Sequence, residues 1–228
     1  FNSNPKYLYG KYSGLLKGNE TAIPRLGTTL AEELGYSKDS ILLIVHADDI
    51  GMHVDQTDGT FNAMKTGMVK SGSVMVPCPD FERVAEIWKK NPDIDLGIHL
   101  TLNSDWGKKY GWGGILPKEQ VPSLYNAEGI LWRNPGQLIE HMNVNEAILE
   151  LEAQILKVFK AGLRPTHMDA HYGNYYNSTA LAKEVMRLSR RYNLPMKPHW
   201  QHRDKMHRSG FVFPDSMWMF FKLHGERF

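Results

Sequence analysis

Residues 41–53 read ILLIVHADDIGMH, an unbroken apolar run that ends in a histidine, two adjacent carboxylates and a glycine. A continuous apolar run of this length is typical of a strand that is buried on both faces of a parallel sheet. We therefore expect a buried strand over residues 41–46, with His46, Asp48 and Asp49 at its carboxyl end.

Strand and helix patterns then alternate along the chain. Short apolar runs are separated by segments in which apolar side chains recur at helical spacing. This alternation predicts an α/β fold, in which a parallel sheet is covered by helices and is either open or closed into a barrel. Further strands are expected at 73–77, 94–100, 166–169 and 194–198, and helices are expected around 61–68, 81–88, 147–159 and 181–188.

The domain organisation follows from where the alternation of strand and helix patterns begins and where it is interrupted. Residues 1–40 read as an N-terminal lead-in with one short helix, TTLAEELG at 28–35, and residues 41–228 read as one domain. Residues 103–140 interrupt that domain with a long insertion rich in glycine, proline and aromatic residues. A connection of this length is either functional or an excursion from the fold.

Composition excludes several classes of protein. Hydrophobic residues make up 42% and charged residues 23% of the 228, which is the balance of a globular protein. The formal net charge of +2 gives no basic surface for nucleic acid. The single Cys78 excludes an internal disulfide, and no apolar run approaches the roughly 20 residues that span a bilayer, so we expect no membrane span.

The compartment stays open at this point. The chain begins at Phe1 and not at methionine, from which we expect that a preceding segment was removed. The location is then cytoplasmic, or periplasmic or secreted if that segment was a signal peptide.

Polar side chains collect where three of the expected strands end. In parallel α/β folds, ligands bind beyond the carboxyl ends of the strands. Imidazole and carboxylate groups there suit a divalent metal ion such as Zn, Mn, Fe, Ni or Mg. The residues are His46, Asp48 and Asp49 after the first strand, His99 in the third, and His167, Asp169 and His171 around the fourth.

Two adjacent carboxylates can have different roles in such a site. Side chains of neighbouring residues in an extended segment point different ways, so one of Asp48 and Asp49 can bind the metal while the other faces a water molecule. Each residue also has a structural explanation, since Asp49 could cap a helix and His99 could be a hydrogen-bonded core histidine. Because several such residues coincide at one edge, we interpret them as a metal site.

Three ordered motifs resemble the signature segments of the YdjC-like carbohydrate deacetylases, the family that includes chitooligosaccharide deacetylases. They are VHADDIG at 45–51, GIHLTL at 97–102 and RPTHMDAHYGN at 164–174. The resemblance spans roughly residues 41–197. It implies a distorted (β/α) barrel with parallel strands similar to polysaccharide deacetylases, one divalent metal ion (Mg, Zn or another transition metal), and hydrolysis of the N-acetyl group of an amino sugar.

The resemblance also implies roles for individual residues. Asp49, His99 and His171 would bind the metal, Asp48 would be the catalytic base, and His167 and Asp169 would line or support the site. His199, which follows the expected fifth strand, is a candidate general acid. The chain departs from the family where His46 replaces the usual asparagine, Ile50 replaces the usual phenylalanine, and HYGN at 171–174 replaces a run of histidines. These changes bear on substrate choice.

Aromatic residues of the insertion suggest how a sugar would bind. Trp106 and Trp112 have flat faces that suit sugar rings, although packing of the loop explains them equally well. The expected partner is a small carbohydrate, and no nucleic acid is expected. The sequence leaves open whether the protein forms a homodimer. Two alternatives to deacetylation also stay open, namely hydrolysis of another amide or ester, and carbohydrate binding by a barrel without catalysis.

Overall fold

The computed structural model describes residues 30–196, which belong to two compact units. Within this range, residues 30–42 belong to one unit and residues 43–196 to the other. The smaller unit contains helix α2 (Leu30–Glu33), which confirms the short helix expected there; Gly35 follows it with a φ of 84°. His199, most of the lead-in and the end of the expected fifth strand lie outside the described residues.

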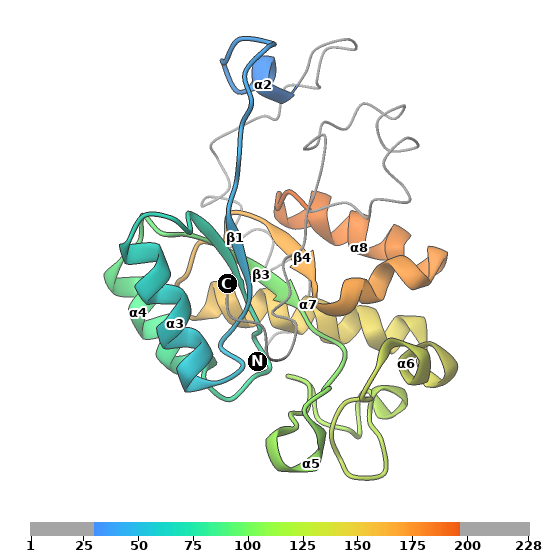
Figure 1. Ribbon diagram of the computed structural model, residues 1–228. Helices are drawn as coiled ribbons and strands as arrows, with labels where there is room; N and C mark the ends of the chain where they lie inside the picture. Colours follow the sequence, from blue (N-terminus) through green and yellow to red (C-terminus); the bar gives the residue numbers. More distant parts are fainter. Residues whose placement is uncertain (1–29, 197–228) are drawn as a thin grey trace, which may run out of the picture. The chain divides into compact units, whose positions relative to one another are not determined.

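Four parallel strands form one sheet in the order β1-β2-β3-β4 (Figure 1). Because each new strand is added on the same side, right-handed crossovers place the intervening helices on one face, as in (β/α) barrels and unlike doubly wound sheets. The expected α/β class with parallel strands is confirmed. The strands are β1 (His46–Ile50), β2 (Ser71–Val74), β3 (Asp95–Leu100) and β4 (Met168–Ala170).

The position of the expected fifth strand is partly visible. Met196 forms a parallel bridge with Met168, and the Met168 N–H donates to the Pro195 carbonyl at 2.8 Å. Since the opposite edge of β4 pairs with β3, this bridge extends the sheet in the same direction as the preceding strands.

Helices follow the strands as the apolar spacing predicts. In α4 the buried side chains are the expected Phe81, Val84, Ala85 and Trp88, and in α8 the Ser178 hydroxyl accepts the Leu181 N–H as an N-cap. No helix within residues 30–196 combines the length and the apolarity that a bilayer crossing requires. The helices are α3 (Val54–Lys65), α4 (Phe81–Lys90), α5 (Gly107–Tyr110), η1 (Pro122–Leu124), α6 (Pro135–His141), α7 (Val144–Lys160), η2 (His171–Asn177) and α8 (Thr179–Tyr192).

The strand expected at residues 41–46 is wrong in its placement. Strand β1 begins at His46 and contains the two carboxylates, whereas residues 41–45 lie outside any strand. The first partner of β1 is Ser71, because β2 begins there, after a turn in which Gly67 has a φ of 83°. Strand length is therefore set by the neighbouring strand and not by the apolar run.

The long insertion has structure of its own and is held by one buried carboxylate. Glu150 of α7 accepts the N–H groups of Ile115 and Leu116, each at 2.8 Å, and also the side-chain amide of Gln154 at 2.8 Å. Glu150 is fully buried. It therefore fastens the insertion to the helix that covers the sheet.

We expect the substitution Glu150→Ala to destabilise the protein by about 3 kcal/mol, because it leaves the partly buried N–H groups of Ile115 and Leu116 without an acceptor. Urea unfolding of the purified variant would measure this change. Glu140→Ala, which removes an exposed carboxylate from α6, is the matched control and should stay within about 0.5 kcal/mol of the parent. A Glu150→Ala variant as stable as that control would show that the carboxylate does not hold the insertion.

Candidate metal centre

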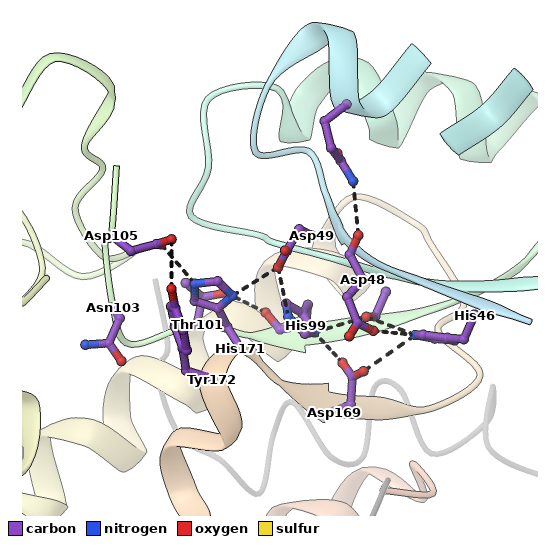
Figure 2. Close-up of polar contacts among 12 residues, drawn as sticks. His46, Asp48, Asp49, His99, Thr101, Asn103, Asp105, Asp169, His171 and Tyr172 are labelled. Atoms are coloured by element: carbon purple, nitrogen blue, oxygen red, sulfur yellow. Dashed lines mark hydrogen bonds and ion pairs between the residues drawn. The ribbon is translucent and has the colours of Figure 1, made fainter. Parts of the chain in front are cut away.

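The backbone of β1 separates its two adjacent carboxylates. The pairing of β1 with β2 is irregular between Ala47 and Ile50, and Asp49 has a φ of 63°, in the left-handed region. Aspartate tolerates this region better than most residues, but such a conformation persists only where the surroundings impose it, commonly at functional sites. As a result, the side chains of Asp48 and Asp49 reach different groups of residues (Figure 2).

Asp49 lies between two imidazoles that come from different strands. Its Oδ1 atom is 3.1 Å from Nε2 of His99, on β3, and 3.0 Å from Nδ1 of His171, which directly follows β4 (Figure 2). Ligand atoms from these three residues all lie within 4.8 Å of one another, and both histidines are buried. Residues far apart in the sequence therefore meet at the carboxyl ends of β1, β3 and β4.

Each of these imidazoles also has a carboxylate on its other nitrogen. Nδ1 of His99 is 2.6 Å from Oδ1 of Asp169, and Nε2 of His171 is 3.1 Å from Oδ1 of Asp105. A carboxylate in this position favours the tautomer that carries its proton on the outer nitrogen. When a cation replaces the proton that each imidazole donates to Asp49, the nitrogen that faces Asp49 has a lone pair available for it.

Asp48 belongs to a second group, which is centred on His46. Nε2 of His46 lies 3.1 Å from Oδ1 of Asp48, 3.5 Å from Oδ2 of Asp169 and 3.2 Å from the Ser73 hydroxyl. Nδ1 of His46 lies 2.9 Å from the Ser71 hydroxyl. Because Asp169 also contacts His99, the two groups form one continuous polar network.

The electrostatics of the network favour positive charge. Burial lowers the pKa of His99, but the charges of Asp169 and Asp49 and their hydrogen bonds outweigh this effect and raise that pKa to about 10. The pKa of His171 is raised in the same sense, because hydrogen bonds to Asp105 and Asp49 outweigh burial. Burial raises the pKa of Asp49, but hydrogen bonds from His171 and His99 hold it well below its usual range.

These residues fit a divalent metal ion. Two imidazole nitrogens and one carboxylate oxygen suit Zn²⁺ and similar transition metals, and carboxylate with water suits Mg²⁺. The outer carboxylates at Asp169 and Asp105 provide the supporting partners that metal-binding histidines usually have. The structure thus contains a group of His and Asp side chains that could hold a metal ion, as the sequence predicted.

His167 lies beside the network. Its Nδ1 atom is 2.8 Å from the Thr166 hydroxyl, and its ring is 5.1 Å from that of His46 in an edge-on arrangement. A side chain at Gly97 would place its Cβ 2.5 Å from the His167 ring, so glycine is needed in β3 at this point. His167 therefore packs against the sheet next to His46.

The two tryptophans singled out in the insertion have different environments. Trp106 is 53% exposed, whereas Trp112 is only 4% exposed and donates its Nε1–H to the Asn103 carbonyl at 3.0 Å. The ring of Trp112 lies 6.4 Å from that of His171, centre to centre. Trp112 therefore supports the insertion from within, and Trp106 is the one that presents a face to solvent.

Asp105 and Tyr172 are among the residues of the network that were not predicted from the sequence. Asp105 contacts His171, and Tyr172, whose φ is 54°, donates its hydroxyl to Oδ2 of Asp105 at 3.3 Å. The polar run TLNSD at 101–105, immediately after the third strand, is the signal that could have identified Asp105.

These features define a class of protein. Its members are parallel α/β domains with a group of His and Asp side chains at the carboxyl ends of the strands. The chain belongs to the family described as YdjC-like protein, whose model matches residues 42–223. This match confirms the resemblance found in the three sequence motifs.

Similar proteins carry related names. The chain is 34% identical over 156 residues to a carbohydrate deacetylase of Enterococcus faecalis, covering 68% of this chain and 57% of that protein. It is 29% identical over 174 residues to a carbohydrate deacetylase of Thermoanaerobacter pseudethanolicus, covering 76% and 67%.

A solved structure shares the fold. The crystal structure of an Enterococcus faecalis protein named for cellobiose-phosphate cleavage matches with a TM-score of 0.66 and 30% identity, covering 76% of this chain and 66% of that chain. The chain thus spans between 57% and 67% of the length of these three relatives.

Proposed function

We propose that this protein is a metal-dependent hydrolase that removes the N-acetyl group from an amino sugar or oligosaccharide. The observation that carries the proposal is that the side chains of Asp49, His99 and His171 meet at one place. A second carboxylate, that of Asp48, comes from the residue directly before Asp49. The names of the related proteins support the carbohydrate substrate. Family membership and the match over residues 42–223 support assigning the deacetylase-like barrel to residues 41–228, after a lead-in at 1–40.

Asp49, His99 and His171 are the proposed ligands of one divalent ion. With two imidazoles in the set, we favour Zn²⁺ or another transition metal over Mg²⁺. When bound, such an ion would polarise the acetamide carbonyl and lower the pKa of a water molecule. The protein holds the three side chains in place through short strands and through the carboxylates of Asp169 and Asp105.

Asp48 is the proposed general base. Its side chain is 38% exposed, whereas that of Asp169 is only 3% exposed, so Asp48 is the carboxylate of the His46 group that water can reach. His46 lies 3.1 Å from Oδ1 of Asp48 and would fix the orientation of the carboxylate. Asp48 would take up the proton of the attacking water, and His199 stays the proposed acid that protonates the leaving amine.

Exposed aromatic side chains next to the centre form the proposed sugar surface. Trp106 follows Asp105 in the chain, and Tyr172, which is 55% exposed, follows His171. The rings of Trp106 and Tyr110 lie 6.5 Å apart in an edge-on arrangement. Flat apolar faces with polar tips suit the faces and hydroxyl groups of a sugar ring.

We expect Trp106→Ala to raise KM for an N-acetylated oligosaccharide by about tenfold and to leave kcat within about threefold, because the ring would contact the sugar equally in the ground and transition states. Steady-state acetate release would measure both constants. Leu149→Ala removes a similarly exposed apolar side chain, from α7, and should leave KM unchanged. An unchanged KM in Trp106→Ala would remove this residue from the sugar surface.

The function itself is tested by incubating the metal-loaded protein with N-acetylglucosamine and its oligomers and measuring acetate and free amine. Equimolar release of both products is the expected result. Turnover of esters or other amides without acetate release would favour a different hydrolase, and splitting of cellobiose phosphate would point to another bond altogether. Binding of the oligomers without turnover of any substrate would favour a carbohydrate-binding protein.

A further inference from the structure

The segment that follows strand β3 is fastened to its surroundings. The Thr101 N–H donates to Oε1 of Gln154 at 3.0 Å, and the Gln154 amide donates back to the Thr101 carbonyl at 2.7 Å. Three residues later, the Ser104 N–H donates to the Trp132 carbonyl at 2.9 Å. Thr101 and Ser104 are fully buried. Asp105 therefore extends from a backbone whose position is fixed by hydrogen bonds to two other parts of the chain.

Asp105 uses both of its carboxylate oxygens on consecutive residues beyond strand β4. Its Oδ1 atom lies 3.1 Å from Nε2 of His171, and its Oδ2 atom accepts the Tyr172 hydroxyl at 3.3 Å (Figure 2). The Asp105 side chain is 20% exposed, so both contacts are partly shielded from water. One carboxylate thus joins the start of the insertion to the end of the sheet.

The contact between Asp105 and His171 has a counterpart within the sheet. Asp169 contacts the outer nitrogen of His99 in the same manner, at 2.6 Å. The two carboxylates have different origins, because Asp169 is part of β4 whereas Asp105 is among the first residues of the insertion. A carboxylate at the outer nitrogen fixes both the ring orientation and the tautomer of a metal-binding histidine.

We propose that Asp105 is a positioning residue for the metal centre: it holds the His171 imidazole with Nδ1 directed at Asp49, and so makes metal affinity depend on the insertion. This inference rests on the metal centre proposed above. Because Trp106 is the next residue, the same backbone segment also carries part of the proposed sugar surface. The insertion would then connect substrate binding to the geometry of the centre.

The test measures metal affinity, which does not depend on catalysis. Zn²⁺ is titrated calorimetrically into the full chain after removal of metal with a chelator, and Co²⁺ absorption reports the ligand geometry. Zn²⁺ affinity should fall by about 10–100-fold in Asp105→Ala. Asp105→Asn preserves size and one acceptor oxygen, and its loss should be smaller. Glu119→Gln, which neutralises an exposed carboxylate in the same insertion, should bind Zn²⁺ as the parent does.

The outcomes separate this inference from the proposed function. If the parent binds Zn²⁺ and both Asp105 variants bind it within about threefold of the parent, the positioning role is overturned and the metal centre stands. If Asp105→Ala abolishes binding as fully as His171→Ala and alters the Co²⁺ bands, Asp105 is a ligand and the inference is also overturned. A parent that binds no Zn²⁺ would overturn both proposals. If Asp105→Ala does not unfold cooperatively on heating, the Zn²⁺ affinity of Asp105→Asn is used alone. An affinity within about threefold of the parent then overturns the positioning role.

Discussion

Replacing Asp48 with asparagine is expected to lower kcat for acetate release by about 10²–10⁴-fold, which is the contribution that a positioned general base typically makes. Asparagine has nearly the same shape and can keep the 3.1 Å contact with His46, but it cannot accept a proton from water. The metal content should stay at the parent level, because Asp49, and not Asp48, lies between the two buried imidazoles. Acetate release and elemental analysis on the same preparation would measure both quantities.

The matched control is Asp93→Asn, which changes an exposed carboxylate in the connection between α4 and β3 and should leave kcat unchanged. A kcat within about threefold of the parent in Asp48→Asn would remove Asp48 from the mechanism. Loss of metal from this variant would instead make Asp48 a ligand.

The second large effect is expected from His99→Ala and His171→Ala, each of which should lose bound metal and activity together. Removing an outer partner of a metal ligand lowers affinity by about 10–100-fold, and removing a ligand should exceed that. Elemental analysis after gel filtration would then find little metal in either variant. His141→Ala, at the exposed end of α6, is the control and should keep its metal.

Unfolding must be separated from metal loss in these variants. His99 is buried against Asp169, so its removal leaves a buried carboxylate without that partner and should lower stability. Circular dichroism at the temperature of the metal assay would show whether each variant is folded. Full metal occupancy in both folded variants would mean that the proposed ligand set is wrong.

Much of the fold could be predicted from the periodicity of apolar residues. Helix α4 buries Phe81, Val84 and Trp88 as expected, because spacing along one helix reports directly which face is covered. The start of β1 could not be predicted in this way. It depends on where β2 begins to pair, which is a property of another part of the chain.

In the candidate site, too, some features could be predicted from the sequence, whereas others depend on distant parts of the chain. The carboxyl ends of parallel strands bring Asp49, His99 and His171 together, and simple topology predicts that they are neighbours, although their roles stay predictions. Asp105 was missed, because its contact with His171 depends on the path of the insertion. The sequence left open whether Trp106 and Trp112 pack or bind sugar, and it could not predict that Trp112 is the buried one, since loop packing has no periodic signal.

The pairing of β3 with β4 has a consequence for how faithfully the chain reaches its native state. His99 and Asp169 are direct Cα partners, so their contact exists only in this alignment of the two strands. A shift by one residue would turn the Asp169 carboxylate toward the opposite face of the sheet. The buried His99 imidazole would then lose its carboxylate partner. Mispaired sheets are thereby disfavoured by charge as well as by shape, and the ion pair that supports the proposed metal centre also favours the correctly aligned strands.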